Sequence, residues 1–279
     1  MIFLTGDPQR PLCCQKRNLE IMKLLFPGYS YLPIEGTLTL DEWVETQNPD
    51  GPCVLEKYGI DKLEQPFDSG VIGFEMPRSY MGWMEKIGIP YMNIMIHPCR
   101  FMTDIVFGVK THIRFNHYLG NEVYRSEMRV AADEYREWMK QHPVDIPFIP
   151  SDHMVVGQSE FDRSVLWGGK FHNVTEFVDV KRKTYRRHPN EQQKYSPEPH
   201  EKVSIYRYFD RLKTIEGMNS SALYEAEFFG INTIYHGPKW WDGYMPIMGK
   251  DLFGIKSAGP NFFRTLFNAW WGYERGRNV

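Results

Sequence analysis

Cysteine, net charge and long apolar runs are all scarce in this sequence, and each scarcity excludes a class of protein. The four cysteines contain no CxxC pair and no metal-ligand spacing, which excludes a zinc ribbon and a secreted disulfide framework. The net charge of -2 excludes the broad basic field of a nucleic-acid-binding protein. No run approaches a membrane span, and the opening apolar residues are too few for a signal peptide. We therefore expect a cytoplasmic protein with at most a peripheral contact at the inner membrane surface.

The chain is long and apolar enough to form one large domain or two modest ones. Of its 279 residues, 42% are hydrophobic, which excludes disorder as the main state. The longest predicted helix, from Glu122 to Lys140, is followed by a proline-bearing stretch that reaches Pro150. We place a domain boundary in that stretch, which divides the chain into residues 1–148 and residues 149–279.

The most informative stretch, residues 212–237, predicts a strand, a polar turn, a helix and a second strand. Ser220 and Ser221 stand where the helix begins, Gly230 is placed to end it, and residues 232–236 predict a buried strand. Hydroxyl groups and unpaired N–H groups at a helix start suit an anion such as phosphate. The alternative is that a serine at this position only caps the helix.

Polar clusters also follow two earlier strands that we predict in the second half. The strand from His153 to Gly157 leads into residues 158–164, and the strand from Thr184 to Arg187 leads into His188-Pro189. Residues 171–181, between the two, are expected to form a helix. Ligands of doubly wound α/β sheets bind at the carboxyl ends of the strands. We therefore expect these clusters to meet at one edge of a sheet.

The first half offers charged residues after two predicted strands. The strand of residues 70–74 delivers Glu75 and Arg78, and the strand of residues 91–96 is followed by Arg100 and Lys110. Glu75 is a candidate acid or base, unless it only pairs with Arg78. Arg100 and Lys110, with Arg78, are candidates for holding a sugar carboxylate or an acceptor phosphate, and surface ion pairs are the alternative.

Taken in order, these clusters resemble a known family. The segments GQSEFDRS, RRHP and GMNSSALYEAEFFG are similar to motifs of the capsule-polysaccharide glycosyltransferases that use CMP-activated sugars, above all the retaining β-Kdo transferases. The upstream GFEMPRS and IPYMNIMIHPCRFMTDIVFG resemble the first domain of the same family. The resemblance covers residues 71–237. Each motif alone is weak, and their occurrence in order along the chain makes the signal more specific.

The resemblance implies a GT-B fold, in which two Rossmann-like domains face each other across a cleft. The nucleotide lies on the second domain and the acceptor on the first. An aromatic helix, which the sequence predicts from Asn261 to Trp271, is expected to pack back on the first domain.

The resemblance also assigns roles to individual residues. Asp162 corresponds to the nucleophile and Glu75 to the general acid/base, with two alternatives: Asp162 only caps the following helix, or Glu160 is the exposed carboxylate. Glu225 would accept hydrogen bonds from the ribose hydroxyls. No metal and no cofactor is expected besides a CMP-linked nucleotide-sugar donor. The residues expected to bind that donor are Gln158, Ser164, His188, Pro189, Asn219, Ser220, Ser221 and Glu225.

We therefore expect a retaining, metal-independent glycosyltransferase that transfers Kdo from CMP-Kdo to a glycan or glycolipid acceptor of a capsule or lipopolysaccharide. One departure from the family concerns Glu75, because Met76-Pro77 follows it where the family continues with Asp and Gly. Two alternatives are a GT-B transferase that uses CMP-sialic acid or a UDP-sugar, and a non-catalytic polysaccharide-binding protein of the same fold.

Overall fold

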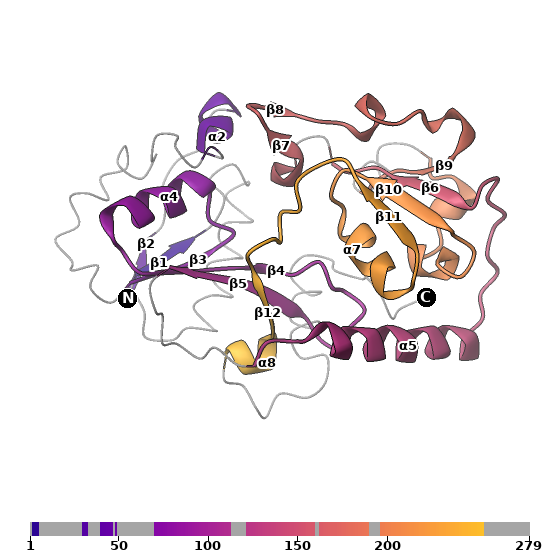
Figure 1. The fold of residues 1–279 in the computed structure, drawn as a ribbon, viewed down its shortest axis with the longest axis horizontal. Coiled ribbons are helices and arrows are strands. Elements are labelled where there is room, and N and C mark those ends of the chain that lie inside the picture. The colour runs from indigo at the N-terminus through magenta and orange to yellow at the C-terminus, as the bar shows by residue number, and fades with distance from the viewer. Residues whose placement is uncertain are drawn as a thin grey trace.

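The computed structural model describes residues 2–5, 30–32, 40–46, 48, 70–112, 121–159, 162–189 and 196–253. These residues form a mixed α/β structure with two main sheets, one of six strands and one of four (Figure 1). The helix predicted over residues 261–271 lies outside the described residues.

The first sheet has the strand order β12-β5-β4-β3-β1-β2. Strands β2, β1, β3 and β4 are parallel, whereas β5 and β12 run antiparallel to their neighbours. Every residue of β3 and β4 is buried, as expected for central strands covered on both faces. The strands are β1 (Ile2–Thr5), β2 (Ser30–Leu32), β3 (Val71–Phe74), β4 (Tyr91–Ile96), β5 (Val106–His112) and β12 (Met245–Met248).

Among the described residues, three helices have only strands of the first sheet next to them in sequence. Helix α4 (Arg78–Ile87) follows β3 directly and ends at Gly88, whose φ of 74° is a left-handed conformation that suits glycine. Helix α2 (Leu40–Thr46) precedes β3, and α8 (Gly249–Leu252) follows β12.

The second sheet has the order β11-β10-β6-β9, and all four strands are parallel. The strands are β6 (His153–Val156), β9 (Thr184–Arg186), β10 (Thr214–Gly217) and β11 (Asn232–Tyr235). Met154 and Ile215 lie in one apolar core with residues of α5 (Arg125–Gln141) and α7 (Ser221–Phe228). Helices therefore cover one face of this sheet.

The opposite face of the second sheet is covered by short, irregular elements. Val155 packs there with Val165, Val174 and Val178. These elements are η3 (Arg163–Val165), β7 (Leu166–Trp167), β8 (Lys170–Phe171), η4 (Val174–Glu176) and η5 (Val180–Arg182). Two further 3-10 turns, η6 (Pro199–Glu201) and η7 (Ile205–Tyr208), precede β10.

Two sequence predictions about the second half are wrong. Residues 171–181 do not form one helix, because Asn173 accepts a hydrogen bond from Thr175 N and Asp179 accepts one from Lys181 N, which starts a separate 3-10 turn at each site. The strand predicted as buried after Gly230 is β11, which lies at the edge of its sheet and has alternating exposed residues.

The chain crosses twice between its two halves. Strand β12 follows β11 in sequence, yet it pairs with β5 of the first sheet. Helix α5 precedes the predicted boundary, yet its Met128 accepts a weak hydrogen bond from the Tyr224 hydroxyl of α7. Figure 1 shows the segment before β12, in orange, running from the second sheet to the first. The division at residues 148/149 stays a prediction. Helix α5 and strand β12 each contact elements on the other side of it.

A shared apolar core fixes the loop after β4 against the second sheet. The ring of Phe101 packs against Phe228 and Phe229 with 5.6 Å between centroids in both pairs. Burying one such side chain contributes about 1.5–3 kcal/mol. The residues that follow β4 are therefore held beside α7.

Candidate functional site

The four strands of the second sheet end at the same level. Val156 is in register with Arg186 and with Gly217, and Gly217 is in register with Tyr235. The segments that follow β6, β9 and β10 therefore leave the sheet at one edge, as the sequence predicts. The candidate residues brought to this edge are Gln158, Asp162, Ser164, His188, Pro189, Asn219, Ser220 and Ser221.

Asn219 is the most buried polar residue of this edge, with no exposed surface. Its Nδ2 donates hydrogen bonds to the backbone carbonyls of Ser164 and Pro238. The backbone carbonyl of Asn219 accepts one from Trp240 Nε1 at 3.0 Å. Two carbonyl acceptors on Nδ2 fix the orientation of the amide. Among the described residues, Asn219 Oδ1 has no hydrogen-bond partner. An unpaired buried acceptor costs about 1–3 kcal/mol, so this oxygen suits a donor group of a ligand.

Gln158, Asp162 and Ser164 form a connected group. Gln158 Nε2 donates to Ser164 Oγ, and Ser164 N donates to Asp162 Oδ1 at 2.8 Å. Asp162 therefore caps η3, which is the alternative considered from the sequence. A carboxylate has a second oxygen, so capping and nucleophilic attack are compatible. Gln158 Oε1 is a second buried acceptor without a partner in the described part of the chain.

Ser220 is the N-cap residue of α7. Its Oγ accepts a hydrogen bond from Ala222 N at 3.4 Å, which is long, and its carbonyl accepts one from Leu223 N at 3.0 Å. No acidic residue lies in the first turn of α7. The partial positive charge of the helix start is thus not neutralised by a carboxylate of its own first turn.

His188 follows β9 and lies close to the end of β6. A Cβ at position 157 would lie 2.7 Å from the Tyr185 hydroxyl and 3.4 Å from His188 N, so glycine at this position permits the close approach of the two segments. The backbone is tied as well, because Gly157 N donates to Arg186 O at 2.8 Å. The positions of Gln158 and His188 are thus coupled.

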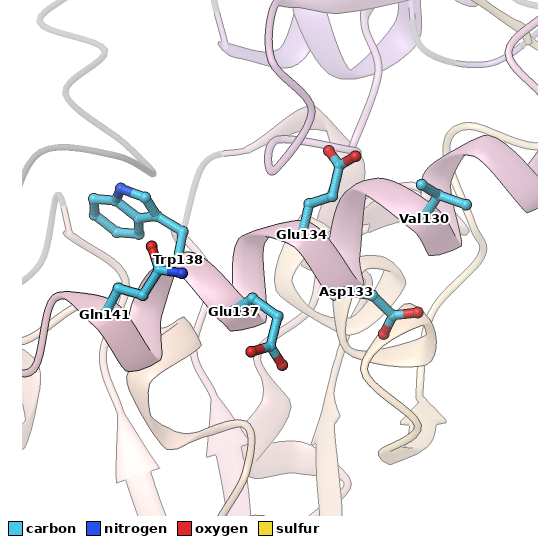
Figure 2. Close-up of a pocket in the computed structure, with 6 residues that line it drawn as sticks. All are labelled: Val130, Asp133, Glu134, Glu137, Trp138 and Gln141. Carbon is cyan, nitrogen blue, oxygen red and sulfur yellow. The ribbon is translucent and has the colours of Figure 1, made fainter.

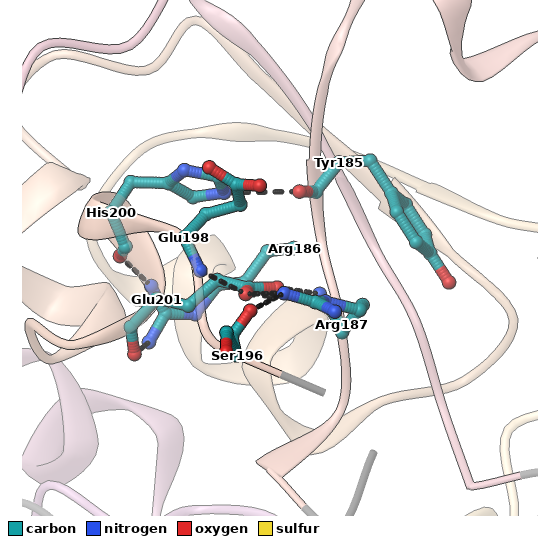
Figure 3. A network of polar contacts seen from close by, with 7 residues as sticks. All are labelled: Tyr185, Arg186, Arg187, Ser196, Glu198, His200 and Glu201. Atoms are coloured by element: carbon teal, nitrogen blue, oxygen red, sulfur yellow. Dashed lines mark hydrogen bonds and ion pairs between the residues drawn. The ribbon is translucent and has the colours of Figure 1, made fainter. Parts of the chain in front are cut away.

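An ion pair supports the segment that carries His188. The Glu201 side chain has no exposed surface and lies in a salt bridge with Arg187, whose backbone N–H also donates to it at 2.8 Å (Figure 3). The second arginine, Arg186, donates to the carbonyls of His200, Glu201 and Val203. The strand end is thereby fastened to η6.

The charge of this pair is well defined. Burial raises the pKa of the Glu201 carboxyl, but hydrogen bonds from Arg187 and from the backbone outweigh burial and lower it to about 2. Glu201 is therefore ionised throughout the physiological range, as the buried partner of Arg187 requires.

Glu225 lies apart from the edge that its neighbours Ser220 and Ser221 form. It is 3% exposed, and its Oε1 accepts hydrogen bonds from Arg100 N at 2.5 Å and from the Tyr206 hydroxyl at 2.6 Å. Burial first, and then the charge and hydrogen bond of Glu225, raise the pKa of Tyr206 well above its usual value. The ribose contact of Glu225 stays a prediction, and this oxygen would have to give up these partners to make it.

Glu75 stands at the carboxyl end of β3, in the first sheet. Its φ of 54° is the one positive value of a non-glycine residue in the described part of the chain. Such a conformation costs about 1–3 kcal/mol and persists only where the surroundings impose it. Here Glu75 N donates to Ile94 O at 2.7 Å and Met76 N donates to Asn93 Oδ1 at 2.9 Å. Glu75 is thus a strained residue at a strand end.

The three candidate cations of the first half lie at different places. Arg78 begins α4, Arg100 lies in the loop after β4, and Lys110 is in β5 opposite Asn93. Lys110 is three residues from Phe107, the partner of the last residue of β4, which is about 10 Å along the strand. The backbone of Lys110 therefore lies within the sheet, about 10 Å from the level at which the loop of Arg100 leaves it.

The imidazole ring of His97, which follows β4, adds no positive charge. His97 is 3% exposed, and burial, followed by the charge of Arg100, lowers its pKa to about 3. Its Nδ1 accepts a hydrogen bond from Cys99 N at 3.3 Å. His97 is therefore neutral at physiological pH.

A hollow on the outer surface of α5 lies away from both strand edges. It measures about 470 Å³ and is lined by Val130, Asp133, Glu134, Glu137, Trp138 and Gln141 (Figure 2). Two of its three carboxylates are already paired, Asp133 with Arg136 at 2.9 Å and Glu137 with Lys140 at 2.6 Å. We assign no function to this hollow.

The described ranges contain no group of three or more His, Cys, Asp or Glu side chains arranged to hold a metal ion. None of the helices in these ranges is long and apolar enough to cross a membrane.

Comparisons with known proteins give distant likenesses among solved structures and none among family models or curated proteins. In structure the chain is similar to KpsC of Thermosulfurimonas dismutans, a beta Kdo 2,7 transferase, with 13% sequence identity over 85% of this chain and 79% of that chain. The TM-score is 0.42, which is too low for fold or function to be inferred from this likeness. The functional interpretation therefore depends on the residues themselves.

Proposed function

We propose that this protein is a glycosyltransferase that transfers Kdo from CMP-Kdo with retention of configuration to a glycan or glycolipid acceptor. The observation that carries the proposal is the meeting of three polar segments at the carboxyl edge of four parallel strands, around the buried and unpaired Oδ1 of Asn219. The order of the motifs GQSEFDRS, RRHP and GMNSSALYEAEFFG supports the same assignment.

Binding of the donor is assigned to the second sheet. The start of α7, with Ser220 and Ser221, and the ring of His188 bind the phosphate of CMP through hydrogen bonds and the helix dipole. Asn219 Oδ1 and Gln158 Oε1 accept hydrogen bonds from hydroxyl or amino groups of the donor. This binding mode requires no metal ion.

The chemistry is assigned to two carboxylates. Asp162 attacks the anomeric carbon, the bond from that carbon to the phosphate oxygen breaks, and CMP leaves. The acceptor hydroxyl then attacks the same carbon, Glu75 takes its proton, and the bond to Asp162 breaks. Two inversions give net retention.

Trapping of the glycosyl-enzyme tests this proposal without knowledge of the acceptor. Purified protein is incubated with CMP-Kdo, and intact mass and peptide mapping are recorded; Glu75→Gln slows the second step and raises the yield of adduct. We expect one sugar on the peptide that carries Asp162 and none in Asp162→Asn.

The matched control is Asp179→Asn, because Asp179 also caps a 3-10 turn, accepting from Lys181 N at 3.0 Å, and lies outside the site. This variant should form the adduct as the wild type does. An adduct in Asp162→Asn, or a product of inverted configuration, contradicts the mechanism. Reaction with CMP-sialic acid or a UDP-sugar and not with CMP-Kdo contradicts the donor assignment, and binding without turnover of any donor contradicts the transferase itself.

A further inference from the structure

The turn that presents Glu75 is held by two hydrogen bonds and by the packing of Met76. The left-handed conformation of Glu75 is flanked by two hydrogen bonds, from its own N–H to Ile94 O and from Met76 N to Asn93 Oδ1. Met76 is folded back over Gly73, where a Cβ would collide with it, and is itself 1% exposed. The strain at Glu75 is therefore maintained by Asn93 and by tight packing.

Both the oxygen and the nitrogen of the Asn93 side-chain amide make hydrogen bonds. Asn93 has no exposed surface, its Oδ1 accepts from Met76 N at 2.9 Å, and its Nδ2 donates to the Tyr244 hydroxyl at 2.8 Å. Nδ2 also lies 3.5 Å from Met81 Sδ. Met76 N can only donate, so it requires Oδ1 on its side, and the Tyr244 hydroxyl and Met81 Sδ then accept from Nδ2.

Tyr244 ends the segment that crosses between the sheets, residues 237–244. At its far end the same segment is bound to Asn219, through Pro238 O at 2.8 Å and Trp240 Nε1 at 3.0 Å. At its near end Tyr244 lies tightly against β5, because a Cβ at Gly108 would be 3.2 Å from Tyr244 Cβ. The segment is thus fastened at the candidate donor edge and beneath the turn of Glu75.

We propose that Asn93 and Tyr244 are positioning residues for Glu75, and that the crossing segment sets where Glu75 lies relative to the donor edge. The positioning rests on the geometry just described, and its effect on reaction rate rests on the proposed function. Misplacing a reacting group by about 1 Å can cost about a hundredfold in rate. Loss of the Tyr244 hydroxyl leaves the ring in place and leaves Asn93 Nδ2 with only the weak acceptor Met81 Sδ, which loosens the amide that holds Met76 N.

The test compares Tyr244→Phe with Tyr208→Phe. Tyr208 is a matched control because it is fully buried and its hydroxyl has no hydrogen-bond partner among the described residues. Backbone hydrogen exchange at Met76 is the first readout. We expect exchange at least tenfold faster in Tyr244→Phe, and wild-type exchange in Tyr208→Phe. Unchanged exchange in Tyr244→Phe overturns the positioning, whether or not the protein is a transferase.

Turnover of CMP-Kdo is the second readout, with Glu75→Gln as the background. We expect kcat to fall about tenfold in Tyr244→Phe at unchanged donor KM, and no further fall when the change is added to Glu75→Gln. Wild-type kcat in Tyr244→Phe, or losses that multiply in the double variant, overturn the link to Glu75. Absence of turnover in the wild type instead overturns the proposed function, and the exchange result still decides the positioning.

Discussion

The carboxyl edges of the two sheets are built in different ways. The second sheet ends in four parallel strands at one level, and its edge gathers amides, hydroxyls and a helix start around Asn219. The first sheet is mixed, and its edge presents Glu75 in a strained turn after β3, whereas the neutral ring of His97 follows β4. Many weak partners suit binding, whereas one carboxylate in a fixed conformation suits proton transfer. Changes at the first edge should therefore affect turnover, and changes at the second should affect binding and stability.

The largest effect is expected from Glu75→Gln, which keeps the shape of the side chain and removes its base. A general acid/base contributes about 10²–10⁴ in rate, so we expect kcat for CMP-Kdo to fall about a thousandfold. CMP affinity, measured by calorimetry, should stay within about twofold. A loss of CMP affinity as large as the loss of kcat would contradict the claim that the first edge affects turnover and the second edge affects binding.

The next effect concerns the support beneath His188. Removing one partner of a buried ion pair leaves an uncompensated charge, so Glu201→Gln should lower the free energy of unfolding by about 3 kcal/mol. The measurement is urea denaturation followed by circular dichroism. Glu137→Gln is the control, because its pair with Lys140 is exposed on both sides and should be worth less than about 1 kcal/mol. Equal losses of unfolding free energy in the two variants would show that the buried Glu201 pair stabilises the protein no more than the exposed pair does.

The same carboxylate predicts a dependence on pH. The pKa of Glu201 is lowered from 4.5 to about 2 on folding, so its contribution to stability is complete above about pH 4.5 and is lost as the pH falls toward 2. Glu201→Gln should therefore show a smaller loss of stability than the wild type between pH 4.5 and pH 2. Identical pH profiles for the two proteins would contradict the ionised, buried pair.

The sequence predicts the positions of most strands well, and the central strands β3 and β4 are the clearest because continuous apolar runs beside glycine or proline define them. Strands β3, β4, β6 and β9 lie within about two residues of their predicted positions, and the three polar segments share an edge as expected. The shared edge needs only parallel strands with a polar segment after each, so the sequence pattern predicts it even though irregular turns replace the helix expected between β6 and β9.

What the sequence did not reveal depends on contacts between distant segments. Asn93 and Tyr244 are 151 residues apart, and their hydrogen bond exists only because β12 returns to the first sheet. A polar residue inside the apolar run YMNIMI was the available signal, since buried polar groups need partners. The contacts of Glu225 depend on distant segments in the same way: its position one turn after Ser221 suggests the donor edge, and tertiary packing brings its Oε1 to Arg100 N and the Tyr206 hydroxyl. Its ribose contact stays a prediction.

Calorimetric titration of CMP into the wild type and His188→Ala shows whether the carboxyl edge of the second sheet binds a cytidine nucleotide. A lost hydrogen bond to a charged group costs about 1.5–3 kcal/mol, so we expect the variant, with its fold intact by circular dichroism, to bind CMP about tenfold to a hundredfold more weakly. Equal CMP affinity in the two proteins, or no CMP binding by the wild type, would contradict the assignment of CMP binding to this edge.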